Sequence, residues 1–349
     1  MLIKSEIKQI RDYLTKSQNP LFLFDDDTDG LSSFLLLYKM VNRGYGVVVK
    51  SSPQLDEQYL PSVKRNRPDQ VYVLDKPKID QEFIDQVNVP IIWIDHHPPQ
   101  KVKGVKYFNP LTRTNKTFPV SFMCYQIAEQ HLWIAAVGTY GDWHLLPPKL
   151  IKQLMKEYPK LLPQVPNSPP EVLFETPLGQ LTRIMNFCLK GKSSDIRKNI
   201  NILSRIDNPY EILDQATARG KFIYKYAAKF NKTYLNLYTR VKKTITREKF
   251  VVFTYTSTQH SLTGDLSNEL LYNYPHKIII IGRVKEGRIN MSLRKDSRYF
   301  DFDMNKLLQQ VFENFDGSGG GHYDACGGNI DADQFNDFVS KFKEMVKSF

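Results

Sequence analysis

Cysteine is scarce in this sequence: 349 residues contain only Cys124, Cys188 and Cys326, and no two of them form a CxxC pair. Cysteines scattered in this way argue against a disulfide framework and against a cysteine zinc site. The sequence also lacks an apolar run near the roughly 18 to 20 residues that a membrane span needs. Its first residues lack the uninterrupted apolar core of a signal peptide. We therefore expect a soluble, cytoplasmic globular protein without a membrane partner, in which oxygen and nitrogen atoms bind any metal.

Acidic residues are fewer than basic ones: the chain has 37 Asp and Glu residues against 48 Lys and Arg residues, which gives a formal net charge of +11. A surface of this sign attracts polyanions such as nucleic acids. Many basic proteins are merely solvated by their lysines, so the net charge alone does not identify a partner.

Short apolar runs recur in the first half of the chain at intervals typical of βαβ units, and helical patterns such as 32–41 and 120–130 lie between them. The runs occupy residues 21–24, 46–50, 71–74, 91–94 and 134–137. We interpret all five as strands. The pattern predicts an α/β protein whose N-terminal domain, residues 1–165, contains a largely parallel sheet.

A Pro-rich passage breaks this alternation between about residues 145 and 175, and helical sequence rich in Lys and Tyr follows. We interpret residues 166–247 as a helical connector. A second, smaller α/β domain is predicted in residues 248–349. Its expected elements are strands at 251–256, 277–284 and 288–294, helices at 266–274 and 302–315, a glycine-rich loop and a final helix.

Acidic residues and histidines follow the predicted strands of the first domain. They are Asp25, Asp27 and Asp29 after the first run, Asp75 after the third, Asp95, His96 and His97 after the fourth, and Asp142 shortly after the fifth. Because the carboxyl ends of parallel strands share one edge of a sheet, these side chains should converge there. Such a donor set suits two divalent ions, Mn²⁺ or Mg²⁺. Two ions in one site can activate water and stabilise the leaving oxygen, so the pattern predicts phosphoester hydrolysis.

Other interpretations of the stretch DDDTDG at residues 25–30 are less consistent with the sequence. An EF-hand loop would place a bidentate glutamate at its twelfth position, which is Leu36. The aspartate motif of haloacid-dehalogenase phosphatases would need Thr or Val at Asp29. An acidic helix cap, with Asp29 and Ser32 satisfying amide groups, explains one acid and leaves the others unexplained.

Together these motifs resemble the DHH phosphoesterases that carry a DHHA1 domain, in particular the RecJ-like nucleases in their compact archaeal form. The matching stretches are DxDxDG at 25–30, the lone Asp75, the Asp-His-His triplet at 95–97, GTYGD at 138–142 and GSGGGHYDACGG at 317–328. The order of the motifs is that of the family. The resemblance covers nearly the whole chain and implies a metal-dependent exonuclease that degrades single-stranded DNA or RNA to mononucleotides in a cleft between the two domains.

The resemblance also implies roles for individual residues. Asp25, Asp27 and Asp75 would hold one metal ion, and Asp29, Asp75, His96 and Asp142 would hold the other, with Asp75 bridging the two. Asp95 would orient His96, and His97 would face the scissile phosphate, which makes Asp95 and His97 the expected catalytic pair. Asp26 departs from the family pattern, and we expect it to be an outward, solvated carboxylate.

A second set of residues is expected to bind the substrate. The resemblance places a substrate-contacting arginine at Arg294. Gly319, Gly320 and Gly321 would let backbone amides approach an anion, and His322 can donate to a phosphate oxygen. A flexible turn between two helices would be the ordinary interpretation of the glycines if no histidine followed them.

Three alternatives stay open at the level of the sequence. The chain ends soon after its DHHA1 motif, as in relatives that cleave very short oligoribonucleotides or cyclic dinucleotides. A non-catalytic replication scaffold is a second alternative, although every ligand position is filled here. A family II pyrophosphatase would lack the GGGH motif. The resemblance also implies DNA repair or replication as the setting, with GINS or a fork helicase as a protein partner if the chain is archaeal.

Overall fold

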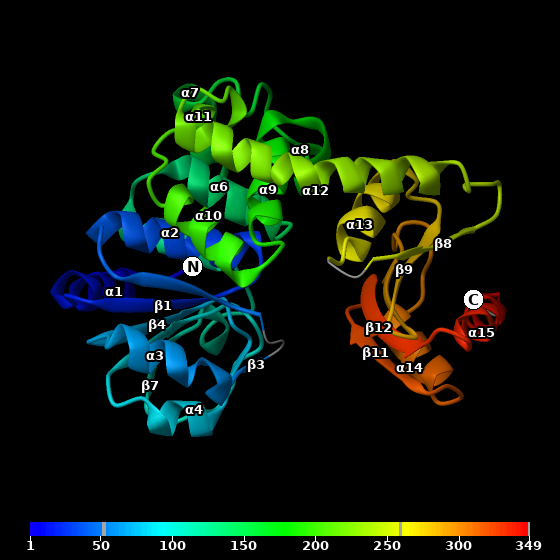
Figure 1. The fold of residues 1–349 in the computed structure, drawn as a ribbon, viewed down its shortest axis with the longest axis horizontal. Helices are drawn as coiled ribbons and strands as arrows, with labels where there is room; N and C mark the ends of the chain where they lie inside the picture. The colour runs from blue at the N-terminus through cyan, green and yellow to red at the C-terminus, as the bar shows by residue number, and fades with distance from the viewer. Residues whose placement is uncertain (51–53, 258–259, 348–349) are drawn as a thin grey trace. The chain divides into compact units, whose positions relative to one another are not determined.

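The computed structural model describes residues 1–50, 54–257 and 260–347. These residues form two compact units, residues 1–228 and residues 229–349, and helix α12 (Ala218–Lys242) begins in the first unit and ends in the second (Figure 1). The boundaries expected from the sequence at 165 and 247 stay predictions. Within the described ranges, no helix has both the length and the apolar character that crossing a membrane requires.

The first unit is built on a five-stranded parallel sheet, and four of the five strands predicted from the apolar runs belong to it. Its strands stand in the order β2 (Tyr45–Val49), β1 (Pro20–Asp25), β4 (Gln70–Leu74), β6 (Ile91–Ile94) and β7 (Val105–Phe108), and two short strands, β3 (Gln54–Leu55) and β5 (Lys78–Ile79), pair separately. Strand β7 was not expected, because its sequence VKYF mixes exposed and buried residues at the edge of the sheet and forms no apolar run.

Helices cover both faces of this sheet, which explains why its central strands are apolar throughout. Leu21, Val71 and Trp93 share a core cluster with residues of α3 and α4. On the other face, the ring of Phe34 in α2 stacks on Phe24, with ring centroids 4.9 Å apart. The helices of this unit are α1 (Lys4–Lys16), α2 (Thr28–Val41), α3 (Leu60–Asn66), α4 (Gln81–Gln86), α5 (Val120–Ala128), α6 (Leu132–Gly141), α7 (Pro148–Glu157), α8 (Pro169–Glu175), α9 (Pro177–Cys188), α10 (Ser193–Leu203) and α11 (Tyr210–Leu213).

The prediction of a strand at residues 134–137 is wrong, because these residues lie in helix α6. Every residue of α6 except the last, Gly141, is buried. A helix buried on all sides has no polar face, so its sequence shows no helical period and cannot be told from a buried strand. A Cβ at Gly138 would lie 2.4 Å from Oγ of Ser121 in α5, which shows how closely these helices pack. Asp142 therefore follows a helix rather than a strand.

The second unit contains a mixed sheet in the order β11 (Gly317–Gly321), β12 (Ala325–Asp331), β10 (Arg288–Arg294), β9 (Ile278–Lys285) and β8 (Phe250–Thr256). Only β8 and β9 pair in parallel. Alternate β10 residues such as Met291 and Leu293 face a core that they share with α14 (Met304–Phe312) and α15 (Phe335–Val346). Helix α13 (Thr263–Asn273) contacts β9 and β10.

The prediction of a glycine-rich loop after α14 is wrong. Residues 317–321 form strand β11, which pairs antiparallel with β12. A Cβ at Gly319 would lie 2.5 Å from the ring of Phe312, and one at Gly317 would lie 2.6 Å from the same ring. Phe312 thus packs directly on the backbone of the strand. Glycine is depleted in strands generally, so a sequence pattern does not predict this one.

Candidate metal centre

The stretch DDDTDG forms a tight turn from strand β1 into helix α2. Asp25 ends the strand, Asp27 is the N-cap of the helix, and its carboxylate accepts a hydrogen bond from the amide of Gly30 at 2.9 Å. A Cβ at Gly30 would lie 2.6 Å from the carbonyl oxygen of Asp25, so only glycine fits this turn. The turn holds Asp25, Asp27 and Asp29 at the carboxyl end of the first strand.

Asp29 is buried, and both of its carboxylate oxygens accept hydrogen bonds from backbone amides at the start of α5. The amide of Val120 lies 2.7 Å from Oδ2, and that of Ser121 lies 2.9 Å from Oδ1. The N-terminus of a helix favours a negative charge, which offsets part of the cost of burying this carboxylate. The helix-cap interpretation thus holds for Asp29, although the helix it caps is α5.

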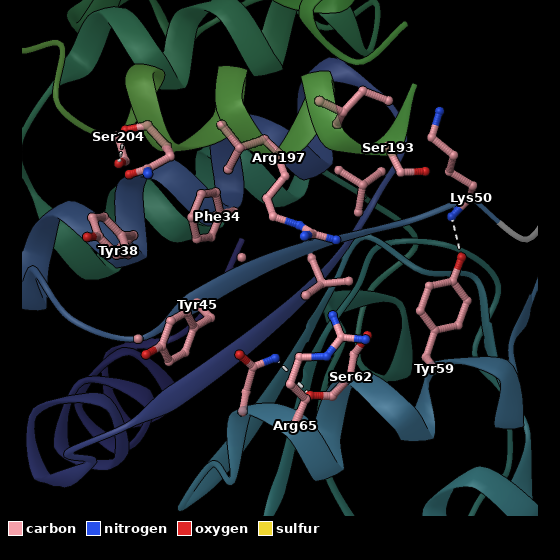
Figure 2. Close-up of a pocket in the computed structure, with 18 residues that line it drawn as sticks. Phe34, Tyr38, Tyr45, Lys50, Tyr59, Ser62, Arg65, Ser193, Arg197 and Ser204 are labelled. Atoms are coloured by element: carbon pink, nitrogen blue, oxygen red, sulfur yellow. Dashed lines mark hydrogen bonds between the residues drawn. The ribbon is translucent and has the colours of Figure 1, made fainter. Parts of the chain in front are cut away.

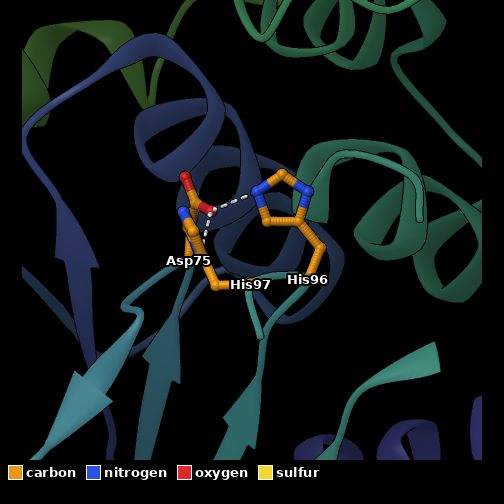
Figure 3. A group of neighbouring side chains, drawn as sticks. All are labelled: Asp75, His96 and His97. Atoms are coloured by element: carbon orange, nitrogen blue, oxygen red, sulfur yellow. Dashed lines mark ion pairs between the residues drawn. The ribbon is translucent and has the colours of Figure 1, made fainter. Parts of the chain in front are cut away.

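Asp75 follows strand β4 and lies at the centre of the cluster. Its backbone is left-handed, with φ of 61°, a conformation that costs most residues about 1 to 2 kcal/mol but is more common for aspartate. Its amide donates to the carbonyl of Ile94 at 3.0 Å. Its Oδ1 lies 3.4 Å from Nε2 of His96 and 4.0 Å from Nδ1 of His97 (Figure 3). The backbone conformation thus places the Asp75 carboxylate between two strand ends.

The side chains predicted as metal ligands converge as the sequence led us to expect. Within each of three groups, the candidate ligand atoms lie within 4.8 Å of one another. The groups are Asp25 with Asp27 and Asp75, Asp29 with His96 and Asp142, and Asp75 with His96 and His97. Asp75 and His96 each belong to two groups, so the three groups adjoin one another.

Several buried polar atoms in this cluster have no hydrogen-bond partner in the described part of the chain. They are Oδ1 of Asp75, Nδ1 of His96 and Oδ2 of Asp142. A buried polar atom without a partner is costly, and bound cations would satisfy such atoms. Carboxylate oxygens with one imidazole nitrogen also form a donor set that suits Mn²⁺ or Mg²⁺. The residues therefore fit the divalent metal that the sequence predicts.

The electrostatics of the cluster indicate the same need for a cation. Burial, followed by the neighbouring carboxylates, raises the pKa of Asp27 to about 7 and the pKa values of Asp29 and Asp75 well above their usual range. Burial lowers the pKa of His96, which keeps its imidazole in the neutral form that binds metals. Without a cation these carboxylates repel one another, and a divalent ion would favour their ionised forms.

Asp95 interacts with His97 and not, as expected, with His96. Its carboxylate accepts a hydrogen bond from Nδ1 of His97 at 2.8 Å and further ones from Tyr107 and Asn109, both at 3.2 Å. In the turn after β6, the backbone amide of His97 also donates to the Asp95 carboxylate, at 3.2 Å. Burial acts to lower the pKa of His97, but the hydrogen bond with Asp95 and the surrounding carboxylates raise it. Asp95 thus orients a histidine that carries a proton readily.

Sequence reasoning missed three basic residues in contact with these acids. Nζ of the fully buried Lys76 lies 2.7 Å from Oδ1 of Asp25, and Nδ1 of His144 lies 3.3 Å from Oδ2 of Asp142. Lys76 directly follows Asp75 in the sequence, and this position beside a predicted ligand was the one sign that Lys76 could belong to the site. Lys50 pairs with Asp26 at 3.3 Å, so Asp26 is a half-buried ion-pair partner rather than a fully solvated carboxylate.

The residues predicted to bind substrate lie together in the second unit. Arg294 pairs with Ala325 in the β10–β12 register, and Gly321 pairs with Cys326 in the β11–β12 register. Gly319 and Gly320 precede Gly321 in β11. His322 follows the strand as an exposed residue, and its amide donates to the carbonyl of Ala325 at 2.8 Å.

Arg294 is largely committed to contacts within this unit. Its Nε donates to Oδ1 of Asn268 at 2.7 Å, and its Nη1 donates to the carbonyls of Leu293 and Cys326 at 2.8 and 3.1 Å. A guanidinium has five N–H donors, so only the two on Nη2 remain for a ligand. Arg294 therefore supports the sheet whether or not it also contacts a substrate.

Comparisons with known proteins agree with this architecture. The family model of the DHHA1 domain matches residues 224–348. RecJ from Thermus thermophilus in complex with Mn²⁺ superposes with a TM-score of 0.69 at 15% identity, covering 100% of this chain and 55% of that one. The exonuclease RecJ bound to manganese superposes with a TM-score of 0.65 at 15% identity, covering 99% of this chain and 94% of that one. No curated protein sequence matches the chain.

A third structure with this fold is the pGpG-specific phosphodiesterase PggH from Vibrio cholerae. It superposes with a TM-score of 0.50 at 13% identity, covering 95% of this chain and 99% of that one. Similarity at these identities establishes the fold, and the chain spans little more than half of the Thermus thermophilus RecJ. The chain thus has a DHHA1 domain in residues 224–348 and a fold like that of RecJ over its whole length.

Proposed function

We propose that this protein is a metal-dependent phosphodiesterase that degrades single-stranded nucleic acid from an end and releases mononucleotides. The observation that carries the proposal is the convergence of Asp75 with ligand atoms from two other parts of the first unit, the turn after β1 and the turn after β6, at positions that match the motifs of the resemblance. Exonuclease RecJ bound to manganese has the same fold, which supports the reaction class.

The cluster would hold two divalent ions, Mn²⁺ or Mg²⁺, in the ligand sets Asp25, Asp27 and Asp75, and Asp29, Asp75, His96 and Asp142. Such ions supply an activated water and neutralise charge on the phosphate. His97, oriented by Asp95, would donate a hydrogen bond or a proton to the scissile phosphate. Lys76 would hold the Asp25 carboxylate in position through their ion pair.

We propose that the second unit binds the phosphate backbone of the substrate. His322 is exposed and able to donate to a phosphate oxygen. Two donors on Nη2 of Arg294 remain for an anion, and glycines 319 to 321 add no side chains of their own to strand β11. A second candidate function is hydrolysis of very short substrates, which the similarity to the fold of PggH favours.

The proposal is tested by incubating the protein with end-labelled single strands of DNA and RNA in the presence of Mn²⁺. We expect mononucleotides to be released from one end and blunt duplex to remain largely intact. Release should stop when a chelator is added and resume when Mn²⁺ is restored. If dinucleotides were cleaved and longer strands were not, the second candidate function would replace the first. If neither were cleaved, the proposal would fail.

His322→Ala should weaken substrate capture more than the chemical step. A lost hydrogen bond from a donor to a charged phosphate is worth about 1.5 to 3 kcal/mol, so KM should rise about tenfold or more while kcat changes little. His276→Ala is the matched control, since His276 is an exposed histidine of the same unit. A large fall in kcat with unchanged KM would instead place His322 among the catalytic groups.

A further inference from the structure

A groove lies along the outer edge of strand β2 in the first unit. It has a volume of about 730 Å³ and is lined by residues of β2, α2, α3 and α10 (Figure 2). Strand β2 stands at the end of the sheet order, so among the described residues its outer edge pairs with no other strand. We call this feature the β2 groove, and the residues that matter for its chemistry are Lys50, Arg65, Arg197, Tyr38, Tyr45 and Tyr59.

The β2 groove is positively charged. Lys50, Arg65 and Arg197 line it, and none of its described lining residues is an aspartate or a glutamate. Arg65 belongs to α3 and Arg197 to α10, and Figure 2 shows both guanidinium groups reaching into the groove from opposite walls. Both arginines are exposed. The groove therefore offers two planar groups that bind phosphate well.

Aromatic rings accompany these cations. Tyr45 is a large residue with 53% of its surface exposed at the start of β2, and Tyr38 and Tyr59 line other parts of the groove. The hydroxyl of Tyr59 accepts a hydrogen bond from the amide of Lys50 at 2.6 Å, which fixes that ring. Cationic groups interleaved with aromatic rings are the usual features of proteins that bind single-stranded nucleic acid.

One end of the β2 groove adjoins the candidate metal centre. Nζ of Lys50 lies 3.3 Å from a carboxylate oxygen of Asp26, and Val49 at the end of β2 is the register partner of Asp25. Residues 45–50 of an extended strand cover on the order of 17 Å, a length that accommodates a few nucleotides. A single-stranded nucleic acid whose end is bound at the metal centre could therefore continue along the groove, past its basic and aromatic side chains.

We propose that the β2 groove binds the part of a single-stranded nucleic acid that extends beyond the metal centre, with Arg65 and Arg197 contacting phosphates and Tyr45 stacking on a base. This inference rests on the proposed function. An acidic, extended protein segment pairing with the edge of β2 would also suit the charge. Nucleic acid is favoured because the groove adjoins a centre suited to phosphodiesters and because the exposed ring of Tyr45 lines it.

The test compares two double variants in binding assays with metal withheld by a chelator. The first is Arg65→Gln with Arg197→Gln. The matched control is Lys64→Gln with Lys198→Gln, which removes the same charge from neighbouring exposed residues of the same helices outside the groove lining. The ligands are a fluorescent dinucleotide and a fluorescent single strand of about eight nucleotides, within the range of known site sizes. Affinity is measured over a range of salt concentrations.

We expect the arginine variant to lower the ratio of octamer to dinucleotide affinity by roughly tenfold or more, and the lysine variant to leave it near that of the wild type. The log-log salt dependence of octamer binding should become less steep by about 1.4, since each phosphate contact contributes about 0.7. Equal behaviour of the two double variants would overturn the inference, as would an unchanged octamer affinity, which would leave the groove to an acidic protein segment. If the wild-type protein bound no oligonucleotide, the proposed function would fail as well.

Discussion

Asp75→Asn is expected to abolish Mn²⁺-dependent hydrolysis while leaving the protein folded. Asp75 lies close to Asp25 and Asp27 and also to His96, and it is the ligand proposed to be shared, so its loss should disturb the binding of both ions. Divalent ions supply several kcal/mol of transition-state stabilisation, and kcat should fall at least about a thousandfold. Asparagine is the sharpest replacement because it keeps the side-chain volume and tolerates the left-handed backbone at this position. The measurement is steady-state hydrolysis of a labelled single strand.

The matched control is Asp26→Asn, the same change at an aspartate that lies outside all three ligand groups. Asp26 pairs with Lys50, so this variant should keep most of the activity. Circular dichroism and thermal unfolding would establish that both variants are folded. Comparable losses of activity in the two variants would contradict the assignment of Asp75 as the shared ligand.

Mn²⁺ is expected to raise the melting temperature of the protein, and to raise it more at pH 7.5 than at pH 5.5. In the metal-free protein, burial raises the pKa of Asp27 to about 7 and those of Asp29 and Asp75 well above their usual range. The folded state thus binds protons more tightly than the unfolded state, and the stability of the metal-free protein should fall as pH rises from about 4 to about 7. Mn²⁺ binds the ionised carboxylates and should reverse this loss.

An ion present at about 100 times its dissociation constant adds about 2.7 kcal/mol to the free energy of unfolding. Two such ions should raise the melting temperature by on the order of 10 °C. Differential scanning fluorimetry with and without Mn²⁺ at both pH values measures this shift. Asp75→Asn should reduce the Mn²⁺-induced shift. A melting temperature that Mn²⁺ leaves unchanged at both pH values would show that the cluster binds no divalent ion.

The sequence predicted those parts of the molecule in which one residue pattern has one structural solution. The central strands β1, β4 and β6 read as apolar runs because both faces of the sheet are covered, and the acids that follow them met at one edge as expected. Asp142 lies near Asp29 and His96 as expected, although it follows helix α6 and not the strand that was predicted there.

Other features depend on contacts that no local pattern records. Lys76 is buried against Asp25, a residue of another strand, and only the fold brings the two together. Asp95 was paired with the wrong histidine because the direction of each side chain is set by the turn after β6. Strand β11 was missed because its glycines exist to make room for the ring of Phe312, which lies on a different element.

The most direct test of the central claim is the number of Mn²⁺ ions that the protein binds, measured by equilibrium dialysis or isothermal titration. If the acid cluster is a two-metal hydrolytic centre, the wild-type protein should bind two ions per chain and Asp75→Asn at most one, with hydrolysis following occupancy of both sites. The claim would be contradicted if the protein bound no Mn²⁺ at high Mn²⁺ concentration, or if Asp75→Asn left the number of bound ions unchanged.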